Sequence, residues 1–290
     1  MASNSFLHNG TLVDEASFTA SWSNRAMRLG DGFFETIRIM EGRPHAWDAH
    51  WARIDACTRA LQLERPPHMD SDFILRSIYR LLESESRSNA RMRLTFYRQG
   101  DGAYLPESNR LAFIGELFPL EHNRFEVKSE GLNLGLYRDM FKQAGPLAPY
   151  KLLGNHVYIQ AAIWASRHHY DDALVCNEDG QLIEATSSNL FVISEGDLLT
   201  PPLSSGCVGG VMRMKVINAA LRRGIPVYEA KLSEEDLLRA SEVFLSNAIQ
   251  GLAWVGSFGR KRYYHKMSDA LIEEVNRMHL ETALEKADFS

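Results

Sequence analysis

The sequence predicts a mixed α/β protein with two domains. Helical and strand-like patterns are interspersed along both halves of the 290-residue chain, without the regular strand–helix alternation that builds a Rossmann sheet. A chain of this length forms one large domain or two of medium size. The pattern breaks around Pro119–Asn123, so we expect a smaller N-terminal α/β domain at residues 1–120 and a larger C-terminal α/β domain at residues 121–290.

The composition is that of a globular protein. Hydrophobic residues make up 45% of the chain and charged residues 24%, and the net charge of −5 argues against a general nucleic-acid binder. No apolar run is long enough to cross a membrane, and the first ten residues do not resemble a signal peptide. The three cysteines cannot all pair and lack zinc-motif spacing. We therefore expect a cytoplasmic protein with no metal, nucleic-acid or membrane partner.

Turn signals and apolar spacing define the elements of the first half. Asn9-Gly10 supplies the positive φ of a tight hairpin turn, and Glu41–Pro44 supplies a second turn between strands. Apolar residues at helical spacing follow Asp48, which we expect to cap a helix. The expected elements are a hairpin, a strand pair, two helices and two strands, at residues 6–15, 32–47, 48–63, 70–84, 90–100 and 109–120.

The second half is organised in a similar way. Turns at Asn177–Gly180 and Glu195–Asp197 divide one apolar stretch into three short strands, and Ser233 is a helix cap. A helix follows Lys151, and paired glycines open another. The expected segments are strands within 124–140, the helix after Lys151, three strands within 171–202, helices at 209–224 and 233–241, strand and turn at 242–258, and a last helix from about residue 266.

Lys151 is the first candidate for chemistry, because it stands where a turn-rich stretch meets the apolar segment "KLLGNHVYIQAAIWA". One interpretation is a surface lysine at the start of a helix, with its charged head in water. The other is a desolvated amine with a lowered pKa, which is able to form a Schiff base. The surrounding residues alone leave both interpretations open.

Four further signals are each ambiguous. The glycines of "GCVGGVMR" (Gly206–Arg213) either simply precede a helix or expose backbone N–H groups to a phosphate. Glu184 is either a solvated residue at a strand end or a carboxylate that keeps a pyridine nitrogen protonated. Arg53 either covers apolar surface with its stem or binds a phosphate. Ser246 and Asn247 stand at a strand end, where polar groups often face a site.

Taken together, these signals suit pyridoxal phosphate. That cofactor needs an amine for its covalent link, an anion for its ring nitrogen and donors for its phosphate. The chain contains no G-x-G-x-x-G or P-loop motif for a nucleotide. We interpret His50, His168 and His169 as structural, because the sequence gives them no ligand or triad geometry.

The sequence resembles the class-IV aminotransferase family, the fold-type IV pyridoxal-phosphate enzymes. The motifs that carry the resemblance occur in the family's order and span nearly the whole chain: "LGDGFFETIRIMEGRPHAWDAHWARI", "YKLLGN", "DDALVCNEDGQLIEATSSNLFVI", "LLTPPLSSGCVGGVMR" and "EVFLSNAIQGLAWV". The resemblance implies a two-domain subunit, a D-amino-acid aminotransferase-like fold with the cofactor in the interdomain cleft and the lysine in the larger domain. It also implies a homodimer.

The resemblance also implies roles for individual residues. Lys151 corresponds to the lysine that binds the cofactor covalently, and Glu184 corresponds to the partner of the pyridine nitrogen. Arg53 corresponds to the residue that holds the phosphate, together with the backbone amides of Val211 and Met212 at a helix start. These five positions make up the expected core of the cofactor site.

Three positions depart from the pattern of the aminotransferases. The family typically has threonines that bind the phosphate where this chain has Met212 and Ala248, so contacts from those side chains are missing. His156 stands where branched-chain enzymes carry a tyrosine near the phenolic oxygen of the cofactor. These departures weaken an assignment as an ordinary branched-chain aminotransferase.

Other positions are similar to those of 4-amino-4-deoxychorismate lyases. These are Thr36, the pair Asn247-Ala248 and the methionine of "GGVMR". The resemblance implies that Thr36 relays a proton and that Asn247 orients the substrate. Arg98, in "TFYRQGDGAY", resembles an arginine of a lyase loop that binds a carboxylate.

Three functions follow from this comparison of motifs. The favoured one is a lyase of folate biosynthesis that converts 4-amino-4-deoxychorismate to 4-aminobenzoate and pyruvate. The alternative is an aminotransferase that acts on branched-chain or D-amino acids with 2-oxoglutarate. The third is an inactive homologue that acts as a binding protein, because a fold does not fix a function. The first two imply a small-molecule amino substrate.

Overall fold

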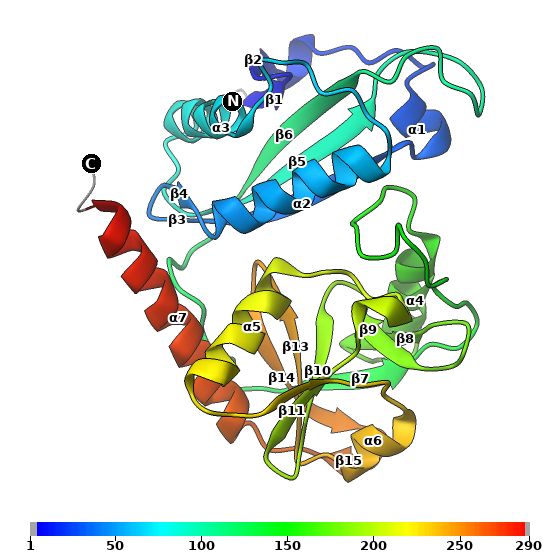
Figure 1. The fold of residues 1–290 in the computed structure, drawn as a ribbon, viewed down its shortest axis with the longest axis vertical. Coiled ribbons are helices and arrows are strands. Elements are labelled where there is room, and N and C mark those ends of the chain that lie inside the picture. The colour runs from blue at the N-terminus through cyan, green and yellow to red at the C-terminus, as the bar shows by residue number, and fades with distance from the viewer. Residues whose placement is uncertain (1–4, 288–290) are drawn as a thin grey trace. The chain divides into compact units, whose positions relative to one another are not determined.

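The computed structural model describes residues 5–287, which divide into two compact units (Figure 1). Unit 1 comprises the described residues up to Asn123 together with Tyr150–Gly154, and unit 2 comprises the remaining described residues. The division falls after Asn123 rather than after residue 120. It also places Lys151 in unit 1, whereas we had expected the lysine in the larger C-terminal domain. The cause is backbone pairing, because the Lys151 carbonyl accepts a 2.8 Å hydrogen bond from the N–H of Phe34.

An antiparallel sheet forms the centre of unit 1. Its strands are β1 (Ser5–His8), β2 (Thr11–Asp14), β3 (Gly32–Met40), β4 (Arg43–Pro44), β5 (Ala90–Arg98) and β6 (Leu111–Pro119). They lie in the order β2-β1-β6-β5-β3-β4. Both predicted turns are confirmed, with φ of 51° at Asn9 and 82° at Gly10, and of 51° at Glu41 and 75° at Gly42.

The helices of unit 1 show how far the predicted caps hold. They are α1 (Arg25–Leu29), which was not predicted, α2 (Trp47–Ala60) and α3 (Ser71–Ser84). Asp70 caps α3 by accepting a 2.8 Å hydrogen bond from the N–H of Phe73. The prediction for Asp48 was wrong, because Ala46 occupies the cap position of α2 and Asp48 lies in the first turn. In the first turn, the negative charge of Asp48 still interacts favourably with the positive end of the helix dipole.

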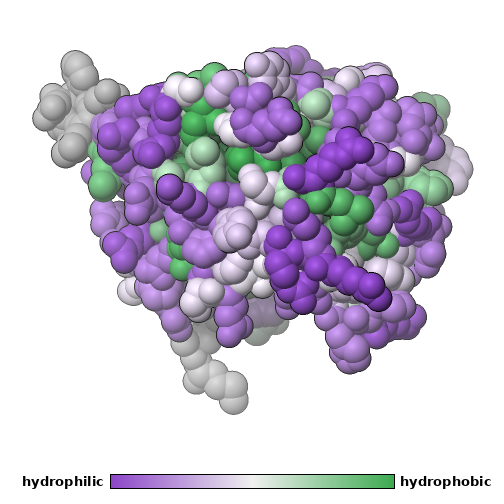
Figure 2. Space-filling model, turned by 90° about the horizontal axis from the view of Figure 1, so that it is seen from below, coloured by the Kyte–Doolittle hydropathy of each residue, from purple (hydrophilic) through white to green (hydrophobic). Residues whose placement is uncertain are grey.

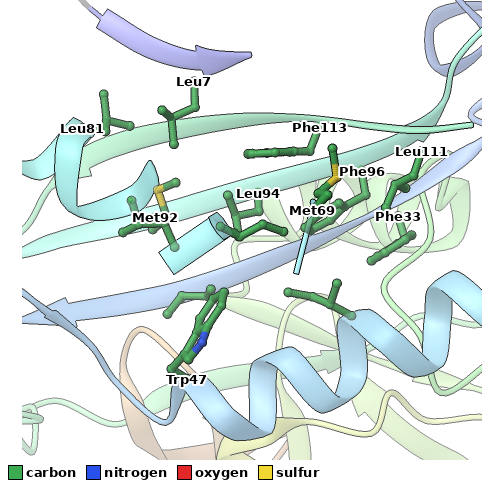
Figure 3. Close-up of a cluster of buried hydrophobic side chains, with 14 of the residues drawn as sticks. Leu7, Phe33, Trp47, Met69, Leu81, Met92, Leu94, Phe96, Leu111 and Phe113 are labelled. Atoms are coloured by element: carbon green, nitrogen blue, oxygen red, sulfur yellow. The ribbon is translucent and has the colours of Figure 1, made fainter. Parts of the chain in front are cut away.

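The core of unit 1 lies between the sheet and the two longer helices. Alternate residues of β3, such as Phe33 and Ile37, pack with residues of α2 and α3. The ring of Phe96 lies 4.9 Å from that of Phe33 and 5.7 Å from that of Phe113, and all three lie in the cluster of Figure 3. Because side chains alternate along a strand, Phe34 and Thr36 lie on the opposite face of the sheet.

The sheet of unit 2 mixes parallel and antiparallel pairs. Its strands are β7 (Leu132–Leu136), β8 (Asp172–Cys176), β9 (Leu182–Ala185), β10 (Asn189–Ser194), β11 (Asp197–Thr200), β12 (Val227–Glu229), β13 (Glu242–Asn247), β14 (Gly251–Phe258) and β15 (Lys261–Arg262). Strand β7 runs parallel to β8 and β14. Strand β9 pairs with β8 and, through Glu184 and Asn189, with β10, which closes the pairing of β7–β10, β13 and β14 into a ring.

Two predictions about strands in this unit were wrong. The stretch 171–202 contains four strands rather than three, because a tight turn separates β9 from β10. Ala185 donates its N–H to the carbonyl of Ser188 at 2.8 Å, and the hydroxyl of Thr186 donates to Asp172 at 2.6 Å. Within 124–140, only Leu132–Leu136 forms a strand. Strand β12 was not predicted.

Four helices belong to unit 2. They are α4 (His156–Arg167), α5 (Val211–Arg222), α6 (Glu234–Arg239) and α7 (Lys266–Ala287). Ser233 caps α6 in a capping box with Asp236, as predicted. In the described part of the chain, no helix is long and apolar enough to span a membrane. Figure 2 shows a face on which hydrophilic side chains predominate and hydrophobic ones form small patches. Cys57, Cys176 and Cys207 are buried and free.

Candidate functional site

A buried ion cluster is centred on Glu35 in unit 1. The alternation along β3 turns this carboxylate toward α2, where only 1% of the residue is exposed. Arg53 of α2 donates from Nε and Nη2 to its two oxygens, both at 2.7 Å, and Nδ1 of His50 lies 2.7 Å from Oε2. Burial alone would raise the pKa of Glu35, but the charge of Arg53 and the bonds from both neighbours lower it to about 2. The carboxylate is therefore ionised.

The cluster fixes the plane of the Arg53 guanidinium. A bidentate arginine–carboxylate pair allows little rotation of either group. The pair uses Nε and Nη2 of Arg53. The predicted role of Arg53 as a phosphate ligand stays a prediction, and the structure adds that Glu35 and His50 hold the side chain in place.

Lys151 lies against β3 and not on a helix. It is half-buried, α4 starts only at His156, and Nζ lies 5.5 Å from the ring centroid of Phe34. Burial lowers the pKa of His50, and the charge of Lys151 acts in the same direction against the opposing effect of Glu35. The interpretation as a lysine at the start of a surface helix is therefore wrong. The alternative, a reactive amine, stays a prediction.

Thr36 shares the open face of the β3–β5 pair with an arginine that the sequence analysis missed. In the register of the two strands, Thr36 lies opposite Arg93. The Arg93 guanidinium carbon lies 3.9 Å from the ring centroid of Phe34, the same ring that Lys151 approaches. The alternation along β5 was the available signal, because it places Arg93 on the face that Thr36 occupies.

Arg98 has a structural position, which corrects its predicted role. It is buried, and all three of its nitrogens donate within unit 1. Nε donates to Asp31 at 3.0 Å, Nη2 to the carbonyl of Leu61 at 2.7 Å, and Nη1 to the side chain of Asn109 at 2.5 Å. These contacts tie β5 to the end of α2 and occupy the groups that would bind a substrate carboxylate.

A second candidate cluster, in unit 2, surrounds Glu184 on β9, and here the solvated interpretation was wrong. Glu184 is only 3% exposed. Its Oε1 accepts from Nζ of Lys142 at 2.8 Å and from the hydroxyl of Tyr158 at 2.5 Å, and its Oε2 accepts from the N–H of Val208 at 2.9 Å. A carboxylate offers about four lone-pair sites. Three are used, so one site on Oε2 is left for a ring N–H.

The segment before α5 is held beside Glu184. Val208 donates its N–H to Glu184, and its carbonyl accepts from Nδ2 of Asn189 at 2.7 Å. A Cβ on Gly210 would lie 2.0 Å from Oδ1 of Asn189, so any larger residue here would displace the Asn189 side chain. Gly210 caps α5 without a side-chain hydrogen bond. The first-turn amides of this helix therefore suit an anion.

The predicted amide donors Val211 and Met212 occupy that first turn. The Met212 side chain is 1% exposed, so it packs in the interior and its contribution to a phosphate is limited to the backbone. The buried methionine side chain therefore does not replace the phosphate contact that a threonine typically makes at this position in the family. The positions of both residues fit a phosphate ligand, and their role in binding stays a prediction.

Asn247 organises the turn between β13 and β14. Its Oδ1 accepts from the N–H groups of Ile249 and Gln250 at 3.0 and 2.8 Å, and its Nδ2 donates to the Ser188 hydroxyl at 2.9 Å. Ala248 is half-buried in the same turn. The Asn247 carboxamide thus has a structural role, and its contacts with cofactor or substrate stay predictions.

Lys142 and Tyr158 are residues of unit 2 that the sequence analysis missed. Lys142 lies in an irregular segment, where no periodic pattern marks a burial site. Tyr158 lies on α4, two residues after the exposed His156, whose place is occupied by a tyrosine in branched-chain enzymes. No simple sequence signal was available for Lys142.

The chain belongs to the class-IV aminotransferase family. The profile described as "Amino-transferase class IV" matches residues 32–258, which include the residues of both candidate clusters. Enzymes of this family depend on pyridoxal phosphate, so the chain is a class-IV enzyme of the lyase or aminotransferase type. The mixed α/β fold is fold-type IV, as predicted.

Relatives of both reaction types are similar to the chain. An aminodeoxychorismate lyase of Vibrio harveyi is 28% identical over 79% of this chain and 84% of its own. A D-alanine aminotransferase of Listeria monocytogenes is 25% identical over 83% of each. A branched-chain aminotransferase of Thermoproteus uzoniensis has the same fold, with a TM-score of 0.87 and 21% identity over 97% of this chain and 96% of its own.

Proposed function

We propose that this protein is an aminodeoxychorismate lyase that binds pyridoxal phosphate. Lys151 would hold the cofactor covalently, and Glu184 would pair with the ring nitrogen. Arg53 and the backbone amides of Val211 and Met212 would hold the phosphate. The free lone-pair site on Glu184 and the uncapped first turn of α5 support this assignment, because they match the cation and the anion of the cofactor.

The bound cofactor supplies an electron sink for the charge left on the carbon that bears the amine. Lys151, once its amine is free, removes the proton from that carbon. Thr36 donates a proton to the ether oxygen as the bond between that oxygen and the ring carbon breaks, so that the enolpyruvyl group leaves together with the oxygen. The ring becomes aromatic as 4-aminobenzoate, and the released enol becomes pyruvate.

The observation that favours the lyase is the cationic position opposite Thr36. Arg93 is half-buried, and its guanidinium packs on Phe34. Burial lowers the pKa of Arg93, but the ordinary pKa of arginine is so high that the group stays charged. Aminodeoxychorismate carries two carboxylates, one of them on the enolpyruvyl group, whereas alanine and leucine carry one. An arginine beside the proposed proton donor suits the additional carboxylate.

The second candidate is an aminotransferase of D-amino acids or branched-chain amino acids with 2-oxoglutarate. Similarity to a D-alanine aminotransferase over 83% of the chain supports it. The same Lys151 removes the same proton, but then returns it at another position, so that a keto acid results. An inactive binding protein has less support, because Lys151 and the partnered Glu184 are both present.

The two reactions are distinguished by their products. We would supply the purified, cofactor-loaded protein with aminodeoxychorismate and, separately, with D-alanine or leucine plus 2-oxoglutarate. Release of 4-aminobenzoate with equimolar pyruvate supports the lyase, and formation of glutamate with a keto acid supports the aminotransferase. Lys151→Ala abolishes either reaction. An absence of all these products with the loaded protein would refute both candidates.

The role of Arg93 has a matched control on the same strand and face. Arg93→Leu raises the KM for aminodeoxychorismate by about tenfold or more, because a charge-assisted hydrogen bond contributes about 1.5–3 kcal/mol. Arg91→Leu changes the KM by less than about threefold, because Arg91 is exposed and stacks on Phe118. Equal KM values for the two variants would exclude carboxylate binding by Arg93.

A homodimer and a cytoplasmic location complete the proposal. Both follow from the resemblance to the family and from the composition. Light scattering of the purified protein tests the dimer, since a mass of 32.8 kDa would indicate a monomer.

A further inference from the structure

Lys142 is a half-buried cation that the proposed reaction does not use. It lies in the segment between β7 and α4, and its side chain is 12% exposed. Its Nζ lies 2.8 Å from Oε1 of Glu184 and 3.0 Å from the carbonyl of Ala148, and 5.3 Å from the ring centroid of Tyr158. These contacts hold the Lys142 ammonium group between the carbonyl of Ala148 and the carboxylate of Glu184.

Glu184 needs a counter-charge before any cofactor arrives. An ionised carboxylate is costly to bury unless it is paired with a cation. Tyr158 cannot supply the charge, because burial and the negative charge of Glu184 raise its pKa well above the ordinary value, so that it is a neutral donor. Val208 contributes a backbone N–H. Of these three partners, only Lys142 carries a positive charge.

The two oxygens of the Glu184 carboxylate also have different partners. Lys142 and Tyr158 both bind Oε1, whereas Oε2 accepts only from Val208 among these groups. A cation at Oε1 therefore orients the group so that Oε2 carries the free lone-pair site. A second cation that binds at Oε2 shares the charge of Glu184 with Lys142.

We infer that Lys142 is a positioning residue, the resident counter-ion of Glu184, which orients the carboxylate and limits how strongly it attracts the ring nitrogen of the cofactor. This inference rests on the proposed binding of pyridoxal phosphate. When Lys142 loses its charge, the ring nitrogen becomes the main counter-cation of Glu184. Its contribution to cofactor affinity then increases.

The experiment isolates the ring nitrogen. The Kd of the apo protein is measured for pyridoxal phosphate and for its 1-deaza analogue, which has carbon in place of the ring nitrogen. The Kd for the 1-deaza analogue divided by the Kd for pyridoxal phosphate reports how much that nitrogen contributes to the affinity. Lys142→Met raises the ratio by about tenfold, because a charge within about 4–6 Å shifts a neighbouring pKa by one unit or more. Lys142→Arg restores the wild-type ratio.

Tyr158→Phe is the matched control, because it removes a donor from the same oxygen without removing a charge. Its ratio stays within about threefold of the wild type, since a neutral hydrogen bond contributes less than a charged one. Lys142→Gln separates charge from hydrogen bonding and decides the matter if Lys142→Met does not fold. It keeps a donor, and its ratio rises as in Lys142→Met.

Each outcome bears on one proposal. A wild-type ratio in Lys142→Gln or Lys142→Met overturns the counter-ion role, and so does a rise in Tyr158→Phe as large as that in the lysine variants. If the wild-type protein binds neither ligand, the proposed cofactor is wrong instead. These readouts do not depend on turnover, so the identity of the amino substrate does not affect them.

Discussion

Replacement of Glu35 by Gln removes the negative centre of the buried cluster in unit 1. Arg53 and His50 then lack the carboxylate that orients them, and the Arg53 guanidinium is left buried beside a neutral amide. Breaking a buried ion pair by removing one partner typically costs about 3–5 kcal/mol. We expect Glu35→Gln to lower the free energy of unfolding by about this amount near pH 7.

The pH dependence gives a second and independent magnitude. Folding lowers the pKa of Glu35 from its ordinary 4.5 to about 2. Each tenfold change in proton affinity corresponds to about 1.4 kcal/mol, so the charged form contributes about 3 kcal/mol. Because the folded pKa is the lower one, this contribution is complete above about pH 4.5 and disappears as the pH falls toward 2.

The assay is urea unfolding of the wild type and Glu35→Gln at a series of pH values between about 7 and 3. The difference between the two unfolding free energies narrows as the pH falls, because only the wild type loses the Glu35 contribution. Glu83→Gln is the control, since Glu83 is an exposed carboxylate of α3. A difference that stays constant with pH, or one below about 1 kcal/mol at neutral pH, would refute the role assigned to the cluster.

Two further substitutions test the structural parts of the candidate site. Gly210→Ala places a Cβ against Asn189 and breaks the hydrogen bond from Asn189 to the carbonyl of Val208. We expect thermal unfolding to show a loss of stability of about 1–3 kcal/mol and titration to show a higher Kd for pyridoxal phosphate. An unchanged Kd would contradict a role of this segment in cofactor binding. Arg98→Met lowers stability by at least about 2 kcal/mol but leaves kcat/KM within about twofold, and a selective rise in KM would return Arg98 to the substrate site.

Local patterns determined much of the fold. The hairpin turns at Asn9-Gly10 and Glu41-Gly42 followed from residues that tolerate positive φ, and Ser233 capped its helix as predicted. The closed ring of strands in unit 2 was not predicted from these local patterns, because it depends on the pairing of Glu184 with Asn189 across a turn that was not predicted either. Strand pairing is decided by contacts far apart in the chain.

The motifs by themselves determined the family and the residues most important to the proposal, namely Lys151, Glu184 and Arg53, because chemistry restricts which side chains can serve a cofactor. Only the tertiary structure decided the surroundings of these residues. It paired Arg53 with Glu35 and Glu184 with Lys142, and it turned Arg98 away from a substrate role. Such partners are set by the distances between atoms on different elements, which sequence spacing does not encode.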